Sequence, residues 1–238
     1  MDIKALQLCA RFALQPNQLG YCGKDSASTQ LQRCLLTGNC DGVESELEKF
    51  IVLHPYLQTI AQITGKDKFS YEVIEAYWLG NDLLKLCKPK HYQLLIKNLE
   101  TQGVPPWLIS EIKAKQPKAF IPIHLFNILH VGVGRASGSV AFTPYSINHC
   151  MLRWGVVKKI IDDKEKKAEV KLIYLENKNH GFQFITKTET VQVTQLLTPN
   201  FKIGDRVIAH WRWVAKKINQ REKAQLAFWT KQLLRYMV

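Results

Sequence analysis

The chain has 238 residues, of which 46% are apolar and 22% are charged, and its formal net charge is +13. This composition is typical of a globular protein and excludes a largely disordered chain. No stretch reaches the roughly 18 apolar residues that a membrane-spanning helix requires, and the first residues lack the apolar run of a signal peptide, so we expect a cytoplasmic protein without a membrane partner.

Helical patterns fill the chain up to about residue 115. Apolar residues recur there at helical spacing, and proline, glycine and capping residues separate the segments. Asp41 and Glu44 have the spacing of a capping box, and Pro105-Pro106 interrupts the pattern before Trp107. We therefore predict helices over residues 3–16, 41–51, 55–65, 70–84, 91–99 and 107–112.

The stretch 120–146 differs from what precedes it. β-Branched residues, glycines and prolines are mixed in it, which predicts irregular structure leading out of a first domain. Its GVGRASG run has one residue too many for the GxGxxG fingerprint of a dinucleotide site. We therefore expect Gly132, Gly134 and Gly138 to serve turns.

Strand patterns dominate from residue 150 onward. Segments rich in β-branched and aromatic residues cover 152–161, 168–175, 181–186, 189–197 and 206–218, and charged or glycine-containing turns separate them. Five short strands favour a small closed barrel of the OB type, and the tail from Asn219 returns to helical spacing. The predicted fold is therefore α+β and multidomain, with an all-α N-terminal domain over 1–146 and a small OB-like β-barrel with a C-terminal helix over 147–238.

Positive charge is concentrated in the second part. Residues 1–146 hold 15 Lys and Arg against 12 Asp and Glu, whereas residues 147–238 hold 18 against 8, so the net charges are +3 and +10. A basic surface attracts nucleic acids, acidic proteins and anionic membranes without distinguishing between them. Charge alone therefore leaves the partner open.

The six cysteines form no CxxC pair, which argues against a zinc ribbon and against a thioredoxin-like motif. In a reducing cytosol most of them should be free thiols. Cys9 falls on the apolar face of the first predicted helix, where we expect a buried structural thiol.

Two motifs in the second part stand out. The run CMLRWGVV begins at Cys150, and the run GDRVIAH ends at His210. They resemble the HypC/HupF family of small hydrogenase-maturation chaperones, whose members begin with C-[LI]-x-x-P-G-x-[IV] and carry G-D-x-V-[LI]-x-H late in the barrel. The resemblance covers about the last 90 residues, although Trp154 replaces the family's proline and the terminal helix is basic rather than acidic.

The resemblance implies that Cys150 transiently binds the iron of an Fe(CN)₂CO unit destined for a nickel-iron hydrogenase, with the imidazole of His210 beside it. A thiolate is a soft donor that suits such iron, and we expect His149, Arg153 and His210 to favour the thiolate by their positive charge. The alternative is that Cys150 is a structural cysteine at the start of a strand. The implied partner is a hydrogenase maturation protein or the hydrogenase large subunit, and the expected contact residues are Arg153, Trp154, Trp211, Arg212 and Trp213.

Four segments of the first part resemble a family of uncharacterised bacterial proteins with the same two-part layout. They are GYCG at 20–23, HPYL at 54–57, VIEAYWLGN at 73–81 and IPIHLFNILHVG at 121–132. A buried carboxylate or imidazole is costly unless it is paired, so the polar groups in these apolar segments are either satisfied core residues or site residues. The candidates for a site in the helical domain are Cys22, Glu75, Tyr77, Asn81, His124 and His130, and Cys22 with His124 and His130 is a possible metal-binding set.

Two other functions stay open beside a metallocentre-assembly chaperone. A basic OB-type barrel with exposed aromatic residues is a platform on which single-stranded nucleic acid stacks, and Trp154, Trp211, Trp213 and Trp229 are the candidates. An enzyme with a site around Glu75, His124 and His130 is the second alternative, although no nucleophile and base stand at a recognisable spacing.

Overall fold

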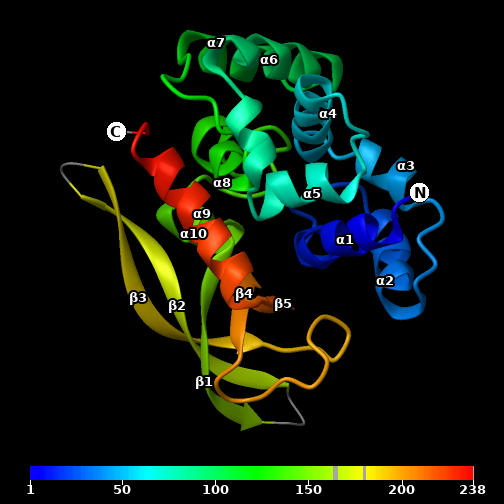
Figure 1. Cartoon of the computed structure of the whole chain (residues 1–238), viewed down its shortest axis with the longest axis vertical. Coiled ribbons are helices and arrows are strands. Elements are labelled where there is room, and N and C mark those ends of the chain that lie inside the picture. Colours follow the sequence, from blue (N-terminus) through cyan, green and yellow to red (C-terminus); the bar gives the residue numbers. More distant parts are fainter. Residues whose placement is uncertain (163–165, 179–180, 238) are drawn as a thin grey trace.

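The computed structural model describes residues 1–162, 166–178 and 181–237. Helices make up the N-terminal part, and five strands followed by a helix make up the C-terminal part (Figure 1). The predicted α+β class and closed barrel are confirmed. No helix within the described ranges combines the length and the apolar character needed to cross a membrane.

The first helix, α1 (Ile3–Gln18), begins at Asp2, whose side chain accepts a hydrogen bond from the amide of Ala5. It continues through Pro16, so the predicted end was slightly too early. Helix α2 (Ala27–Thr37) was not predicted, because only three of its residues are buried and its apolar stripe is therefore short. A disulfide joins Cys34 near its end to Cys40, and the remaining four cysteines are free.

The following helices lie close to their predicted positions. The segment predicted as one helix over 70–84 is divided, because Gly80 adopts a left-handed φ of +78° that ends α5 before a 3₁₀ turn begins at Asp82. The predicted capping box at Asp41 is wrong, since Gly42 occupies the N-cap of α3. The helices are α3 (Val43–Glu48), α4 (Leu53–Thr64), α5 (Tyr71–Trp78), α6 (Tyr92–Thr101) and α7 (Pro106–Ala114), with 3₁₀ turns at Asp82–Leu86 and Pro89–His91.

The stretch predicted as irregular contains three short helical elements. Helix α8 (His124–Phe126) runs into a π-helical turn, Asn127–Gly132, and α9 (Pro144–Cys150) follows after a loop. Helix α9 begins with a capping box between Thr143 and Ser146. These elements connect the helical part to the first strand of the barrel.

The barrel contains β1 (Arg153–Asp162), β2 (Lys167–Lys178), β3 (Gly181–Gln192), β4 (Arg206–His210) and β5 (Trp213–Lys217), closed in the order β1-β2-β3-β5-β4. The predicted number of strands is right for two compensating reasons. Strand β3 is continuous where two strands were predicted, and the single strand predicted over 206–218 turns at Trp211, which has a φ of +53°.

Helix α10 (Gln220–Leu234) lies between the barrel and the helices (Figure 1). Its Trp229 packs so closely on Gly80 that a Cβ atom there would lie 2.4 Å from the indole. One hydrophobic core includes residues of both parts, among them Phe12, Trp78, Ile208 and Trp229, while a smaller core fills the barrel around Val170. The fold changes near residue 146, but the core continues across that position.

A candidate metal centre between the helices and the barrel

Three buried side chains from distant parts of the sequence meet where the helical part contacts the barrel. His124 is the first residue of α8, Cys150 is the last residue of α9, and His210 is the last residue of β4. One ligand atom from each of them lies within 4.8 Å of the other two, and this is the only group of three or more potential metal ligands found in the described ranges. Sulfur and imidazole nitrogen are the donors that bind zinc, iron and cobalt.

The hydrogen bonds of His210 define its protonation. Its Nδ1 lies 2.7 Å from the carbonyl oxygen of Phe12, and a carbonyl only accepts, so Nδ1 carries the proton. Burial lowers the pKa of His210 to about 4, so the ring is neutral at pH 7. Its Nε2 therefore carries a lone pair, which cannot bond to the nearby carbonyl oxygen of Cys150, and this buried atom has no hydrogen-bond partner among the described residues.

His124 has the opposite tautomer. Its Nε2 donates to the carbonyl oxygen of Cys150 at 3.0 Å and lies 3.8 Å from the Cys150 sulfur. Its Nδ1 therefore accepts from the hydroxyl of Tyr77 at 2.9 Å, while Asn127 donates to that hydroxyl at 3.3 Å. Burial, and then the nearby His210, lower the pKa of His124 well below 6.5, so this ring is also neutral.

Cys150 is a protonated thiol in this environment. Burial raises its pKa well above 9, and the neighbouring Cys22 raises it further. The expectation that basic surroundings favour a thiolate is therefore wrong. Both imidazoles are neutral, and Arg153 and His149 are engaged by Glu189 instead.

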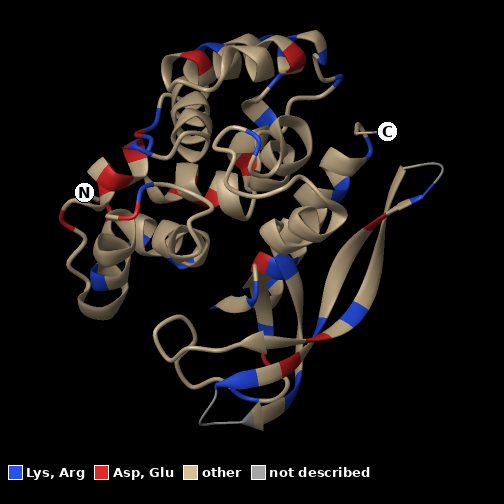
Figure 2. Cartoon of the chain, turned by 180° about the vertical axis from the view of Figure 1, so that it is seen from behind, with Lys and Arg blue, Asp and Glu red and all other residues tan. Residues whose placement is uncertain are grey.

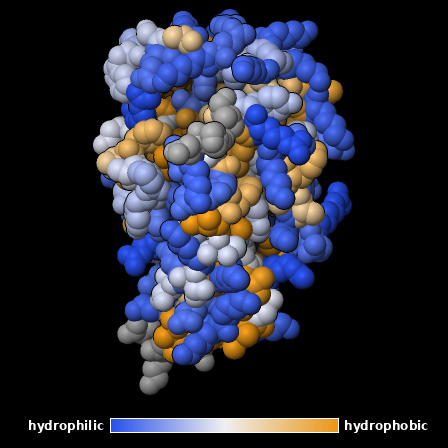
Figure 3. Space-filling model, turned by 90° about the vertical axis from the view of Figure 1, so that its left-hand side faces the viewer, coloured by the Kyte–Doolittle hydropathy of each residue, from blue (hydrophilic) through white to orange (hydrophobic). Residues whose placement is uncertain are grey.

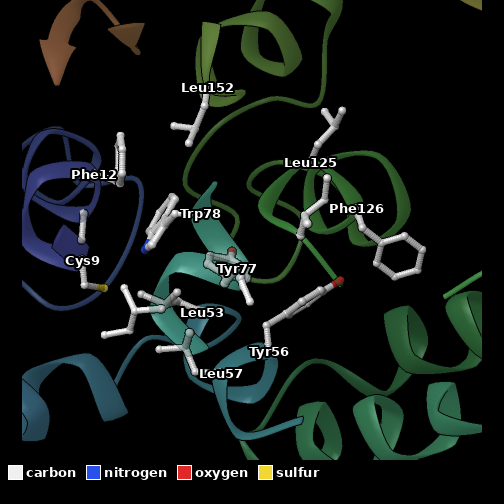
Figure 4. Close-up of a cluster of buried hydrophobic side chains, with 14 of the residues drawn as sticks. Cys9, Phe12, Leu53, Tyr56, Leu57, Tyr77, Trp78, Leu125, Phe126 and Leu152 are labelled. Carbon is white, nitrogen blue, oxygen red and sulfur yellow. The ribbon is translucent and has the colours of Figure 1, made fainter. Parts of the chain in front are cut away.

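A cavity of about 410 Å³ leads to the three side chains. Cys150, His124 and His210 line it together with the exposed Lys24 and Lys49, so it connects buried groups with the surface. Tyr77 and Trp78 of α5 also line it, and Figure 4 shows Trp78 between Phe12 and Tyr77. The indole of Trp78 lies 4.5 Å from the ring of His124 and 5.9 Å from the ring of His210, which holds both imidazoles in place.

Arg153 lies in the barrel wall and does not reach the surface. Its guanidinium is fully buried and donates to Glu189, to Tyr174 and to the carbonyl oxygen of Trp211. Burial alone would raise the pKa of Glu189, but the hydrogen bond from His149 and the charge of Arg153 lower it to about 2. This network fixes the barrel end beside Cys150 and pairs the guanidinium of Arg153 with the carboxylate of Glu189.

Most of the residues expected to contact a partner are also buried. Trp154 is 7% exposed and Trp211 is 3% exposed, because both belong to the hydrophobic core. Trp213 is half-buried, and Arg212 is exposed. Trp229, a candidate for base stacking, is buried where α10 packs on Gly80. Of the predicted contact residues, Arg212 and Trp213 are therefore the ones accessible to a partner.

The predicted site in the helical domain divides into separate groups. Glu75 accepts a hydrogen bond from Asn81 at 3.0 Å, and His130 pairs with Tyr92 at 2.6 Å. Cys22 lines the cavity near Cys150, whereas His130 is not part of the cavity lining. Of the predicted metal-binding set Cys22, His124 and His130, the structure thus places only His124 in the cluster of ligand atoms.

Sequence reasoning did not find that His124 joins Cys150 and His210. The three residues are separated by 26 and 60 positions, and no local spacing relates them. Asn127 and the carbonyl group of Phe12 were missed as parts of the site for the same reason. Each contributes through a contact that exists only after the helices have packed on the barrel.

Comparisons with known proteins assign the chain to a family but give it no activity. A search of curated proteins and a search of solved structures each found no match. The model of one family, described as a family of unknown function (DUF6390), matches residues 2–238. Because this match spans nearly the whole chain, including both the helices and the barrel that form the metal-ligand cluster, the protein belongs to the DUF6390 family.

Proposed function

We propose that this protein is a cytoplasmic accessory chaperone of nickel-iron hydrogenase maturation that holds an Fe(CN)₂CO unit through Cys150. The observation that carries the proposal is the cluster itself, in which the Cys150 sulfur and the imidazoles of His124 and His210 meet at the inner end of a cavity. The resemblance of the CMLRWGVV and GDRVIAH segments to HypC/HupF chaperones supplies the identity of the cargo. The strand order, in which β5 lies between β3 and β4, suits an OB-like barrel.

The geometry suits a cargo that arrives and leaves. Cys150 is a thiol before binding, so formation of the sulfur–iron bond would release its proton to water, and the sulfur would take up a proton from water when the iron is passed on. The unpaired Nε2 of His210 is a ready donor that needs no proton removed. The cavity joins this donor pair to the surface, which gives the cargo a path.

A partner would dock on the basic part of the molecule. Figure 2 shows Lys and Arg distributed over the strands of the barrel, which carries most of the net charge. The face that presents β2 and β3 is mainly hydrophilic, with apolar patches between the charged groups (Figure 3). We propose an acidic protein as the partner of this basic part, and Arg212 and Trp213 are the predicted contact residues that are exposed or half-buried.

The proposal is tested by isolating the protein without oxygen from cells that assemble nickel-iron hydrogenase. We expect iron in the wild type, with infrared bands of bound cyanide and carbon monoxide, and neither in Cys150→Ala. Cys87→Ala is the matched control, because Cys87 is also a buried free thiol but does not line the cavity. Equal iron and equal bands in all three proteins would refute the role of Cys150.

A nucleic-acid-binding function makes a different prediction. Phosphate contacts release counterions, so affinity for single-stranded oligonucleotides would fall steeply with salt concentration. The stacking residues such binding needs are mostly unavailable, since Trp154, Trp211 and Trp229 are buried. Salt-sensitive oligonucleotide binding that is lost in Trp213→Ala, together with no iron, would displace the maturation proposal.

A further inference from the structure

We infer that His124 is the third protein ligand of a metal site that the helical part and the barrel build together, and that this site also binds a free divalent ion such as Zn²⁺, Fe²⁺ or Co²⁺. Cys150 and His210 are the other two ligands. The inference concerns the donors themselves, so it holds for a bare ion whether or not the proposed hydrogenase cargo is correct.

The strongest evidence for a ligand is the unpaired nitrogen of His210. Its side chain is 1% exposed, and a buried polar atom without a partner costs free energy that a folded protein rarely leaves uncompensated. The Nδ1–H bond to Phe12 fixes the ring so that the lone pair of Nε2 stays available. This arrangement, in which a backbone carbonyl orients the ring through its other nitrogen, is the usual outer-shell support of a metal-bound histidine.

His124 becomes a ligand by changing its tautomer. At present Nε2 holds the proton and donates it to the Cys150 carbonyl, while Nδ1 accepts from Tyr77. When a metal binds Nε2 of His124, the proton resides on Nδ1 instead. The hydrogen bond between Nδ1 and Tyr77 then reverses, so that Nδ1 donates and the Tyr77 oxygen accepts. Tyr77 can serve both tautomers because a hydroxyl is donor and acceptor in one group.

The distances leave room for an ion after small side-chain movements. Zinc binds nitrogen at about 2.0 Å and sulfur at about 2.3 Å, which places ligand atoms about 3.3 to 3.5 Å apart in a tetrahedral site. The Cys150 sulfur and His124 Nε2 are already 3.8 Å apart, and the whole set lies within 4.8 Å. Rotations that move the atoms by about 1 Å therefore complete the site.

Three protein ligands leave a coordination position open, as in catalytic and transfer sites rather than closed structural ones. The cavity borders all three residues, so the open position faces the space through which a ligand enters. Three protein ligands also fit an octahedral iron that carries three diatomic ligands, because such an iron has three of its six coordination positions left for the protein. Binding one divalent ion forms three bonds to the protein and releases one proton, from the Cys150 thiol.

The test is titration of the metal-free full-length protein with Co²⁺, followed by its optical absorption. We expect one equivalent of cobalt to produce a thiolate-to-metal charge-transfer band and intense visible bands of tetrahedral cobalt. Cys150→Ser should lose the charge-transfer band, and His124→Gln should weaken cobalt binding at least tenfold and change the visible bands. His130→Gln is the matched control, since His130 is a half-buried imidazole that, like the buried His124, is bonded to a tyrosine but lies outside the cluster.

The variant Tyr77→Phe tests whether Tyr77 positions His124 without itself binding the metal. Removing the hydroxyl leaves all three donors in place, so the visible bands should keep their shape while the affinity falls about tenfold, as for other outer-shell partners of metal ligands. Near-ultraviolet circular dichroism of each metal-free variant shows that the fold is retained. Wild-type protein without the bands, or His124→Gln with unchanged bands and affinity, would overturn the inference. A cobalt site in a protein that never carries cyanide-bound iron would instead refute only the proposed cargo.

Discussion

The side chains at the centre of this protein have charge states that burial decides. Cys150, His124 and His210 are all neutral, because a low-dielectric environment penalises the thiolate and the imidazolium alike. Three neutral donors form a site that does not repel a cation and that becomes anionic only when the metal replaces the thiol proton. This explains why the site needs no basic residue beside the sulfur.

The Arg153–Glu189 pair provides a test of stability at the residue scale. Glu189→Gln leaves the fully buried guanidinium of Arg153 without its counter-charge, and breaking such a pair costs about 3 kcal/mol of unfolding free energy. The exposed pair Lys66 and Glu72 is the control, where Glu72→Gln should cost less than about 1 kcal/mol. Chemical denaturation measures both values, and equal effects would contradict a structural role for the buried pair.

His130 makes the stability depend on pH. Burial lowers its pKa to about 4 from 6.5, so the unfolded chain takes up a proton more readily than the folded protein. The stabilising contribution is complete above pH 6.5 and is lost as the pH falls towards 4. We expect the unfolding free energy of His130→Gln to fall less than that of the wild type over this window, and parallel pH curves would show that His130 does not titrate as described.

The site could be predicted only in part from the sequence. Motif resemblance brought Cys150 and His210 together because both belong to recognisable sequence motifs, one that leads into the first strand and one that covers β4. His124 was recognised as a candidate but assigned to a different set, since no periodicity reports which helix end packs on which strand. The protonation of Cys150 was predicted wrongly because burial raises the pKa of its thiol, and because His149 and Arg153 contact Glu189 in the fold.

At the scale of elements, the features that local sequence patterns encode were predicted, and those that depend on tertiary contacts were not. Helices with a broad apolar face, such as α4 and α5, were predicted near their observed positions, whereas α2 buries too few residues to stand out. The turn at Trp211, which divides β4 from β5, contains no glycine or proline from which it could be predicted. It is held by a tertiary contact, in which the Trp211 amide donates to the carbonyl of His149 at 2.6 Å.

The contact between α5 and α10 gives a prediction at this scale. Gly80→Ala places a Cβ in a left-handed conformation and 2.4 Å from Trp229, so we expect a loss of about 2 to 4 kcal/mol in unfolding free energy. Gly103→Ala is the control, because its φ is also positive but nothing lies within 4 Å of the new Cβ. That variant should lose only about 1 kcal/mol, and equal losses would mean that α10 does not pack on Gly80 in solution.

The whole molecule should unfold in one step. One hydrophobic core contains residues of the helices and of the barrel, and Arg11 of α1 and Gln225 of α10 add hydrogen bonds between distant segments. We therefore expect coincident transitions by far-ultraviolet circular dichroism and tryptophan fluorescence, and we expect the isolated segment 147–238 not to fold stably. Two separate transitions would show that the parts before and after residue 146 unfold independently.

In the proposed site, one sulfur and two imidazole nitrogens bind a metal where the helices meet the barrel. X-ray absorption at the metal edge of protein loaded with one equivalent of zinc measures those ligands directly. We expect one sulfur at about 2.3 Å and nitrogen or oxygen neighbours at about 2.0 Å that include two imidazole rings, recognised by their multiple scattering. A shell without sulfur, or an unchanged spectrum in Cys150→Ser, would contradict it.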